Sequence, residues 1–259
     1  MKIGLLAPFE GVYRQAGYDA LTAMRTAIDE QNPAGVDVLP LALDTSRDVA
    51  RTGQKALADP SVVAIVGPFW AAEASVLGGQ LDRTKWFSPY NPVGDVTWRT
   101  EWMDRARLFA DKEGRRLVLA GLPAGWLEAA EKIVTGPDGV QAGDLVLWLG
   151  DAAAGADFAA ALWQRLPDAP FGLDAAGVET VLQRAGAQAK GQLFAIAWID
   201  DGYSDWAASH SPNTPAAYTV YRLTANILHN LNGQTTATNW QPALFIVDAE
   251  GRLRLLSDR

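Results

Sequence analysis

Short apolar runs alternate with longer amphipathic segments along almost the whole chain, and this alternation restricts its fold more than any other feature. The runs at 2–7, 61–66 and 144–149 are nearly continuous in apolar residues. The segments between such runs carry apolar residues at helical spacing, for example Leu21 and Met24. Strands that alternate with helices are typical of βαβ units, which form parallel sheets covered by helices. The sequence therefore predicts an α/β fold.

The same pattern gives the bounds of each expected element. The expected strands are 2–7, 36–43, 61–66, 86–88, 116–120, 144–149, 170–173, 192–199, 243–247 and 252–256, the last two forming a hairpin. The expected helices are 13–30, one capped by Ser46, 71–81, 100–111, 126–134, 157–166, 178–185 and 215–231. Pro40 restricts the second strand to a sheet edge or a broken strand. The polar segment 202–214 is expected to be irregular.

Two lobes are expected, because the rhythm breaks at 89–94, where two prolines flank Tyr90 and Asn91, and then restarts. We interpret this break and the segment 202–214 as crossovers between lobes. The N-terminal lobe is then 1–92 plus about 203–242, and the C-terminal lobe is about 93–202 plus 243–259. Two such halves joined by more than one crossover form a cleft, and small molecules bind in clefts.

Composition excludes several classes of function. A formal net charge of −8 argues against a nucleic-acid partner, which would require clustered lysines and arginines. The chain has no cysteine, so thiolate catalysis and cysteine-ligated metals are excluded. Its two histidines, His210 in a polar segment and His229 in a helical pattern, are not expected to bind a metal. No apolar run is long enough to span a membrane.

Catalytic motifs are missing, so we expect a protein that is not an enzyme and carries no cofactor. No G-x-S-x-G elbow or Walker A motif occurs, and the turn at 8–13 lacks the glycines of a dinucleotide-binding loop. Asp200 and Asp201 resemble a pair of glycosidase carboxylates, but adjacent residues of a strand point to opposite faces. We interpret them as a solvated turn.

The chemistry at the expected carboxyl ends of the strands predicts a binding site, because α/β sheets bind ligands there. Aromatic and polar residues follow strands of the first half, and two acids follow strands of the second half. The candidate ligand-binding residues are Glu10, Tyr13, Trp70, Ala71, Tyr90, Asn91, Asp151 and Asp174. A zwitterion or an amine fits this set, with a helix N-terminus for its anion, a carboxylate for its cation and aromatic rings for its body. The alternative is that Trp70 and Tyr90 only pack at the interface of the lobes.

The order of several motifs resembles one family. The stretch I-G-L-L-A-P-F-E-G-V-Y at 3–13, followed by G-Y-D-A at 17–20, is similar to the start of the branched-chain amino-acid binding proteins, which are type I periplasmic solute receptors of ABC transporters. D-T-S at 44–46, V-V-A-I-V-G-P at 62–68 and F-S-P at 87–89 resemble the family's next segments at suitable spacing. The helix 218–231 resembles a later family helix that carries an aromatic–Asp–Ala cluster, where this chain has Tyr221, Arg222 and Leu223.

The resemblance implies two Rossmann-like lobes with parallel sheets, joined by hinge crossovers. It implies a small-molecule ligand captured between the lobes, an ABC permease as partner, and a periplasmic or extracellular location with a lipid anchor as one option. We expect a monomer, and the N-terminus shows no export signal within this sequence. By position, the family's carboxylate-binding segment maps onto Trp70 and Ala71, its next segment onto Tyr90 and Asn91, and its ammonium-binding acid onto Asp174.

Departures from the family pattern affect the expected ligand. The family's serine and threonine hydroxyls are absent at 70–72 and 90–93, and an aspartate replaces the usual glutamate at Asp174. The chain is shorter than ordinary members, and most of the missing residues are expected between 93 and 200. These differences favour an amino-acid-like compound with an aromatic or bulkier body, or an amine.

Three other functions remain open. The same fold serves as the ligand-binding domain of a sensor or regulator without transport. An enzyme on a Rossmann-like sheet would use Asp151 or Asp174 in turnover. A degenerate family member would fill its own pocket with Trp70 and Tyr90. Among the four, the import receptor is the leading hypothesis.

Overall fold

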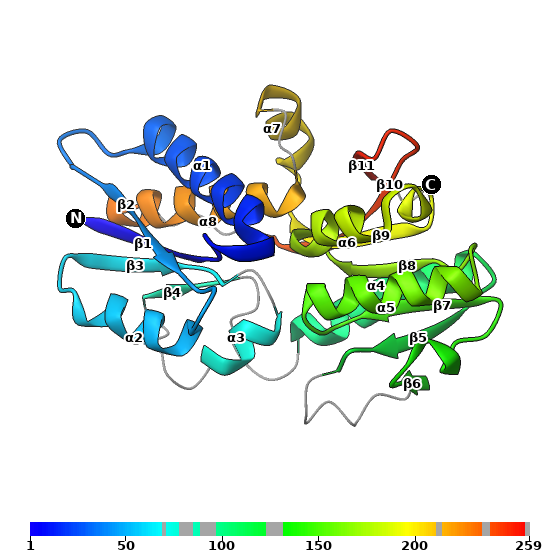
Figure 1. The fold of residues 1–259 in the computed structure, drawn as a ribbon. Coiled ribbons are helices and arrows are strands. Elements are labelled where there is room, and N and C mark those ends of the chain that lie inside the picture. Colours follow the sequence, from blue (N-terminus) through cyan, green and yellow to red (C-terminus); the bar gives the residue numbers. More distant parts are fainter. Residues whose placement is uncertain are drawn as a thin grey trace. The chain divides into compact units, whose positions relative to one another are not determined.

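The computed structural model describes residues 1–68, 71–77, 85–88, 97–122, 132–210, 214–234 and 239–256 (Figure 1). The chain divides into two compact units. Unit 1 is Met1–Asp95 with Trp198–Gln241, and unit 2 is Val96–Ala197 with Pro242–Arg259. The expected break at 89–94 lies outside the described residues.

Unit 1 is built on a parallel four-stranded sheet in the order β2-β1-β3-β4. The strands are β1 (Lys2–Ala7), β2 (Leu39–Asp44), β3 (Val62–Val66) and β4 (Trp86–Phe87). Ile3, Leu5 and Leu6 of the central strand β1 are completely buried. Burying each such side chain contributes about 1.5–3 kcal/mol. The predicted edge position of the strand that contains Pro40 is confirmed, since β2 is the outer strand.

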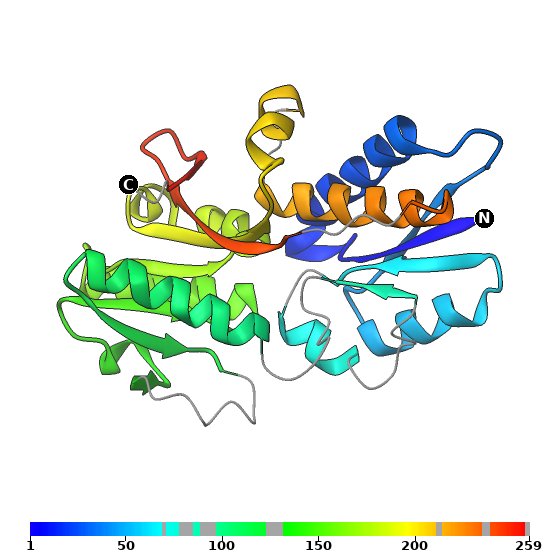
Figure 2. The same ribbon diagram turned by 180° about the vertical axis from the view of Figure 1, so that it is seen from behind.

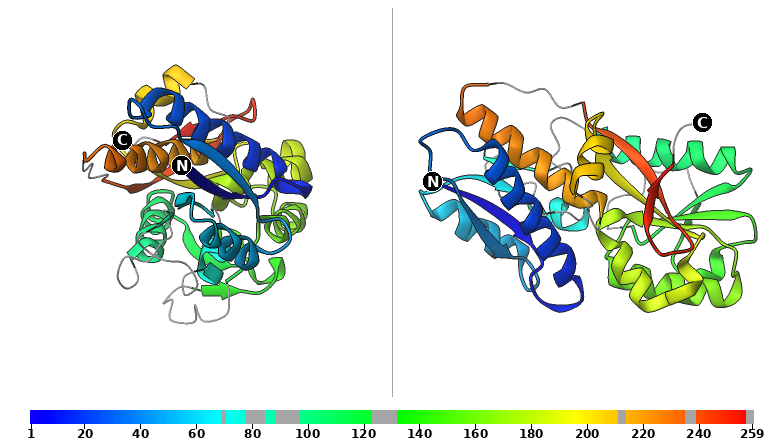
Figure 3. Two further views of the ribbon diagram at one scale, coloured as in Figure 1. Left: turned by 90° about the vertical axis from the view of Figure 1, so that its left-hand side faces the viewer. Right: turned by 90° about the horizontal axis from the view of Figure 1, so that it is seen from above.

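Helices cover both faces of this sheet, which is why its central strands are apolar on both sides. They are α1 (Arg14–Gln31), α2 (Val49–Ala58), α3 (Ala71–Leu77) and α8 (Pro215–Leu231). The helices α1 and α8 run side by side on one face, and α2 and α3 lie on the other (Figures 1 and 3). The bounds of α8 agree with the prediction, because Thr214 caps its first turn and Pro215 occupies a position that needs no amide hydrogen.

Unit 2 is built on a seven-stranded sheet in the order β11-β10-β9-β8-β7-β5-β6. Its strands are β5 (Arg116–Ala120), β6 (Lys132–Val134), β7 (Asp144–Trp148), β8 (Phe171–Asp174), β9 (Leu193–Ile199), β10 (Gln241–Val247) and β11 (Leu253–Leu255). The strands β5 to β9 pair in parallel, whereas β10 and β11 form the predicted antiparallel hairpin. The residue Ile199 at the end of β9 already belongs to unit 1.

The helices of unit 2 also cover both faces of their sheet. They are α4 (Thr97–Lys112), α5 (Ala152–Arg165) and α6 (Val178–Ala185), with short 3-10 turns η2 (Pro137–Gly139), η3 (Ala175–Gly177) and η4 (Gly186–Ala189). The pair α5 and α6 lies on one face, and α4 lies on the other (Figures 1 and 2). Phe109 of α4 packs on Phe194 of β9, with ring centroids 5.5 Å apart.

Four local predictions are wrong. Residues 132–134 form β6 instead of the end of a helix, because they pair with β5. Residues 203–210 of the supposed irregular segment form α7 (Tyr203–His210). The helix expected at 157–166 begins at Ala152, where Asp151 caps it. The cap of α2 is Asp48, whose carboxylate accepts from Arg51 N, and the Ser46 hydroxyl bonds elsewhere.

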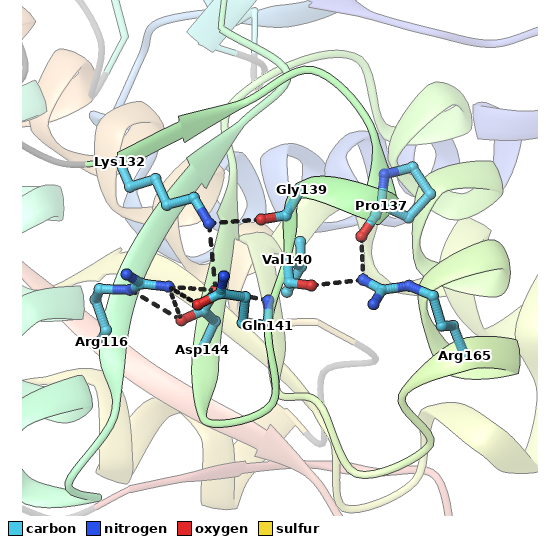
Figure 4. Close-up of polar contacts among 8 residues, drawn as sticks. All are labelled: Arg116, Lys132, Pro137, Gly139, Val140, Gln141, Asp144 and Arg165. Atoms are coloured by element: carbon cyan, nitrogen blue, oxygen red, sulfur yellow. Dashed lines mark hydrogen bonds and ion pairs between the residues drawn. The ribbon is translucent and has the colours of Figure 1, made fainter.

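A polar network fastens the amino ends of three strands in unit 2 (Figure 4). Asp144, which is 2% exposed, accepts hydrogen bonds from Arg116 at 2.7–3.0 Å and from Gln141 N at 2.8 Å. The ammonium of Lys132 lies 4.0 Å from the same carboxylate. Nearby, Arg165 donates to the carbonyls of Pro137 and Val140 and so fixes the turn η2. This network lies at the amino ends of the strands, opposite the edge where α/β sheets bind ligands, so we interpret it as structural.

Gly17 tests the packing of α1 on the loop that follows β1. A methyl group at Gly17 would lie 1.9 Å from the carbonyl oxygen of Pro8, a distance that backbone atoms cannot accommodate. Gly17→Ala should therefore lower the free energy of unfolding by about 1–3 kcal/mol or more, despite the better helix propensity of alanine. Urea unfolding followed by circular dichroism measures the change. Gly136→Ala is the control, because a methyl group there meets open space. An unchanged midpoint for Gly17→Ala would contradict this packing.

Candidate functional site

The loops after β1 and β2 in unit 1 are joined through the carboxylate of Asp44. Its Oδ1 accepts from Phe9 N at 2.8 Å, from Ser46 N at 3.2 Å and from Ser46 Oγ at 2.7 Å. The Ser46 hydroxyl also lies 3.1 Å from both the amide nitrogen and the carbonyl oxygen of Glu10. The backbone of the loop after β1 is therefore fixed by side chains of the loop after β2.

The charge of Asp44 is stabilised by these contacts. Partial burial alone would raise the pKa of Asp44, but the hydrogen bonds from Phe9 and Ser46, with Arg47 nearby, lower it below its ordinary value of 3.8. The carboxylate remains ionised at neutral pH and keeps its acceptor role. The loop after β1 thus has a defined shape before any ligand binds.

Glu10 and Tyr13 both lie in this fixed loop region at the carboxyl end of β1. The carboxylate of Glu10 is exposed and lies 3.3 Å from the guanidinium of Arg47, which is also exposed. Such an exposed pair contributes little to stability, so Glu10 can exchange this partner for another at small cost. Tyr13 is half-buried and ends the 3-10 turn η1 (Gly11–Tyr13), directly before α1.

The loop after β3 begins with a backbone turn that only glycine allows. Gly67 has φ +97°, and a methyl group there would lie 2.4 Å from the carbonyl oxygen of Leu6. The indole of Trp86 donates to the carbonyl of Gly67, and the hydroxyl of buried Ser88 donates to that of Pro68 at 3.2 Å. These bonds hold the ends of β3 and β4 together.

The predicted residues that follow these two strands are only partly described. Ala71 is the first residue of α3. Trp70, Tyr90 and Asn91 lie outside the described residues. Their assignment to the binding site stays a prediction.

The two predicted acids of unit 2 follow neighbouring strands and cap helices. Asp151, after β7, accepts from the amides of Ala153 and Ala154 at 2.9 and 3.1 Å and so begins α5. Asp174, the last residue of β8, accepts from Ala176 N at 3.0 Å and begins η3. Negative charge is stabilised at such positions by the helix dipole. The structure thus gives both carboxylates a capping role, which the sequence analysis did not assign.

Trp148 lines the same edge of unit 2 beside Asp151. Its indole nitrogen donates to the carbonyl of Asp151 at 2.8 Å, and its ring packs on Phe158. A methyl group at Gly121 or at Gly155 would lie 2.6–2.8 Å from the Trp148 ring. The two glycines therefore make room for this half-buried indole.

The interpretation of Asp200 as a solvated residue is wrong. Asp200 is 8% exposed and accepts from Arg222 Nε at 2.7 Å, from the hydroxyl of Tyr218 and from Gly202 N at 3.0 Å. Burial alone would raise the pKa of Asp200, but these hydrogen bonds and the charge of Arg222 lower it below 3.8. Asp201, the next residue, is exposed, which agrees with the prediction for that position.

Sequence reasoning named the motif D-T-S at 44–46 for its resemblance, with Ser46 as a helix cap, and missed its role in shaping the loop after β1. Asp44 and Ser46 shape the loop that carries Glu10 and Tyr13, and Thr45 between them is buried. A signal was present, because serine and aspartate directly after a strand often bond to backbone amides nearby. The partner loop, however, is 36 residues away along the chain.

Within the described ranges, no cluster of three or more histidine or acidic residues is arranged to hold a metal ion. In the same ranges, no helix is both long and apolar enough to cross a membrane.

Asp200 and Asp201 offer a matched pair of substitutions. Asp200→Asn should lower the free energy of unfolding by about 1–3 kcal/mol, because Arg222 loses its buried counter-charge. Asp201→Asn should change it by less than about 0.5 kcal/mol, because this exposed side chain makes no hydrogen bond or ion pair among the described residues. Since the pKa of Asp200 is lowered in the folded state, its contribution is present above pH 3.8 and is lost as the pH falls through the lowered value.

Urea unfolding of both variants over a range of pH measures these effects. Equal midpoints for the two variants at neutral pH would show that the Asp200–Arg222 pair adds nothing to stability.

Comparisons with known proteins give structural matches only. A scan against protein-family models and a search of curated protein sequences return no match. Among solved structures, a leucine binding protein from Thermotoga maritima is similar, with a TM-score of 0.69 at 13% identity, over 99% of this chain and 98% of that one. The isoleucine complex of a branched-chain amino acid transporter substrate binding protein from Streptococcus pneumoniae matches with a TM-score of 0.62 at 14% identity, over 99% of each chain.

A third match extends the comparison to another transporter protein. An ABC transporter substrate-binding protein from Sphaerobacter thermophilus matches with a TM-score of 0.63 at 17% identity, over 100% of this chain and 97% of that one. At such identities the likeness concerns the fold, and it extends over nearly the whole of each chain. The predicted α/β fold is confirmed, and the chain has the type I periplasmic binding protein fold.

Proposed function

We propose that this chain is an extracytoplasmic solute-binding protein that captures a small molecule for import by an ABC transporter. The observation that carries the proposal is the similarity over 99% of the chain to substrate-binding proteins of such transporters. The motifs of the first 92 residues resemble the same family and are a second support for the proposal. The partner of the loaded protein would be the permease.

The ligand would be amino-acid-like, or an aromatic compound or amine. We assign its contacts to Glu10, Tyr13, Trp70, Ala71, Tyr90, Asn91, Asp151 and Asp174. Two observations within the units support this choice. The loop that carries Glu10 and Tyr13 is held by Asp44 in a defined shape, which lowers the entropic cost of binding. Asp151 and Asp174 place two carboxylates at the ends of neighbouring strands, where an ammonium group would be attracted.

Binding without chemistry fits the described strand ends. Ser88, which follows β4, donates its hydroxyl to a backbone carbonyl. Both histidines contact side chains near the end of α1, His210 at Glu30 and His229 at Gln31. Neither contact provides a base for Ser88, and a serine nucleophile requires one within hydrogen-bonding reach.

A thermal-shift screen tests the proposal. The panel contains amino acids, amides, aromatic acids and polyamines. A ligand present at one hundred times its Kd stabilises the folded state by about 2.7 kcal/mol, which raises the unfolding temperature by several degrees. Mass spectrometry of the protein as purified identifies any ligand that accompanies it. No shift with any compound, together with no accompanying molecule, would contradict the proposal.

Two aspartates near opposite ends of β8 provide matched variants for the ligand found. Asp174→Asn should weaken an amine or zwitterion by about 10- to 100-fold, because a charged hydrogen-bond partner is lost while the amide oxygen can still cap η3. Asp168→Asn is the control, since Asp168 is exposed and precedes the amino end of β8. Calorimetric titration measures both affinities. Equal affinities in the two variants would show that Asp174 does not contact the ligand. The assignment of the fold would not be changed by that result.

A further inference from the structure

The helix α7 follows the point at which the chain passes from unit 2 to unit 1, between Ala197 and Trp198. It contacts the rest of unit 1 through an aromatic cluster. Trp206 of α7 packs on Tyr218 and Tyr221 of α8, with ring centroids 5.2 and 5.3 Å apart. His210, the last residue of α7, stacks on the Trp206 ring with centroids 5.0 Å apart and planes inclined by 18°.

Both ring nitrogens of His210 face hydrogen-bond acceptors. Nδ1 lies 2.9 Å from the carbonyl oxygen of Trp206, and Nε2 lies 2.9 Å from Oε1 of Glu30. A backbone carbonyl and an ionised carboxylate can only accept. Neutral imidazole carries one N–H, so it would satisfy one contact and direct a lone pair at the other oxygen. The doubly protonated ring satisfies both contacts.

The second oxygen of Glu30 is also engaged, which keeps its carboxylate ionised. The Tyr221 hydroxyl donates to Oε2 at 2.6 Å. This bond and the contact with His210 lower the pKa of Glu30 below 4.5. In turn, the hydrogen bond to Glu30 raises the pKa of His210 above 6.5. The same side chains thus join α7, α1 and α8.

The charged and titratable groups near His210 are few. Glu30 faces it from α1, and Tyr221 faces it from α8 at 5.7 Å between ring centroids. Arg222 of α8 pairs with Asp200, and the exposed Asp205 lies on α7 itself. The remaining tyrosines of the cluster, Tyr203 and Tyr218, stay neutral, since burial raises the pKa of each. Among the described residues, Glu30 is therefore the anion that contacts the imidazolium.

We propose that protonated His210 is a pH-sensitive clamp that fastens α7 to the last turn of α1. When the imidazole ring is charged, Trp206 contacts it through its indole face and its backbone carbonyl. Glu30 contacts the other ring nitrogen through its carboxylate. Loss of the proton removes one of the two hydrogen bonds and the attraction to Glu30. The segment that follows the crossing from unit 2 is then held less firmly. This inference does not depend on the proposed solute.

The direction of the pH effect follows from the shifts in the pKa values of His210 and Glu30. His210 has a raised pKa in the folded state, so its contribution is full below pH 6.5 and is lost as the pH rises through the raised value. Glu30 has a lowered pKa, so its contribution is present above pH 4.5 and is lost as the pH falls through the lowered value. The clamp is therefore strongest between these limits.

Titration of the imidazole signals by nuclear magnetic resonance tests the protonation directly. The chain has two histidines, so the His210→Gln variant assigns both signals. His210 should titrate above its ordinary 6.5, with both nitrogens protonated below the midpoint. Glu30→Gln should move the midpoint of His210 down, because the hydrogen bond to Glu30 raises its pKa. A His210 midpoint at or below 6.5, or one that Glu30→Gln does not move, would overturn the clamp.

Hydrogen exchange of the α7 amides in the full chain tests the mechanical consequence. After correction for intrinsic exchange, protection of residues 203–210 should fall about two- to fivefold between about pH 6 and pH 9, the range expected for a partly exposed ion pair. His210→Gln should give the lower protection at both pH values, whereas His229→Gln should behave as the parent chain. A pH-dependent loss that persists in His210→Gln would assign the effect to another group and overturn the proposal.

Discussion

Complete burial of the central strands is the constraint on which the rest of the structure depends. In β1 and β3 of unit 1, and in β7 and β9 of unit 2, nearly every side chain is buried between two layers of helices. Polar side chains are unfavourable in such strands, because burying an unbonded polar group costs several kcal/mol. Polar chemistry is therefore displaced to the strand ends. There Asp151 and Asp174 each accept from the backbone that follows their own strand, and Asp44 accepts from the loop after the neighbouring strand β1.

This use of strand-end carboxylates connects folding with binding. Asp151 satisfies two helix amides and Asp174 satisfies one, amides that would otherwise require water or a ligand, so each of these helix starts already holds a negative charge. A carboxylate at the same place attracts a cation in place of an anion. In unit 1, Asp44 and Ser46 are used in shaping the loop, whereas the ion pair of Glu10 with Arg47 is exposed and exchangeable. This division between fixed and exchangeable groups is the reason why we propose Glu10, and not Asp44, as a ligand contact.

The sequence predicted the elements whose pattern is local and missed those that depend on distant partners. The bounds of α6 and α8 were predicted correctly, because their caps and apolar faces are set within the segment itself. The strand β6 was predicted as helix, since only pairing with β5 makes it a strand. The polar composition of α7 gave no helical signal, and its cluster with Glu30 joins residues 180 apart along the chain. For the same reason, the sequence signalled that Asp44 could bond to a backbone amide but did not show that the amide of Phe9 is the partner.

The pair formed by Asp200 and Arg222 shows how α8 accommodates a charged side chain beside the interior of unit 1. An arginine at a half-buried position needs a counter-charge, and Asp200 supplies it from the turn that ends β9. Tyr218 adds a hydroxyl to the same carboxylate from one turn earlier in α8. The pair satisfies its own charges within unit 1. What this part of α8 requires is that its polar groups keep their partners, because an unpaired charge there would be costly.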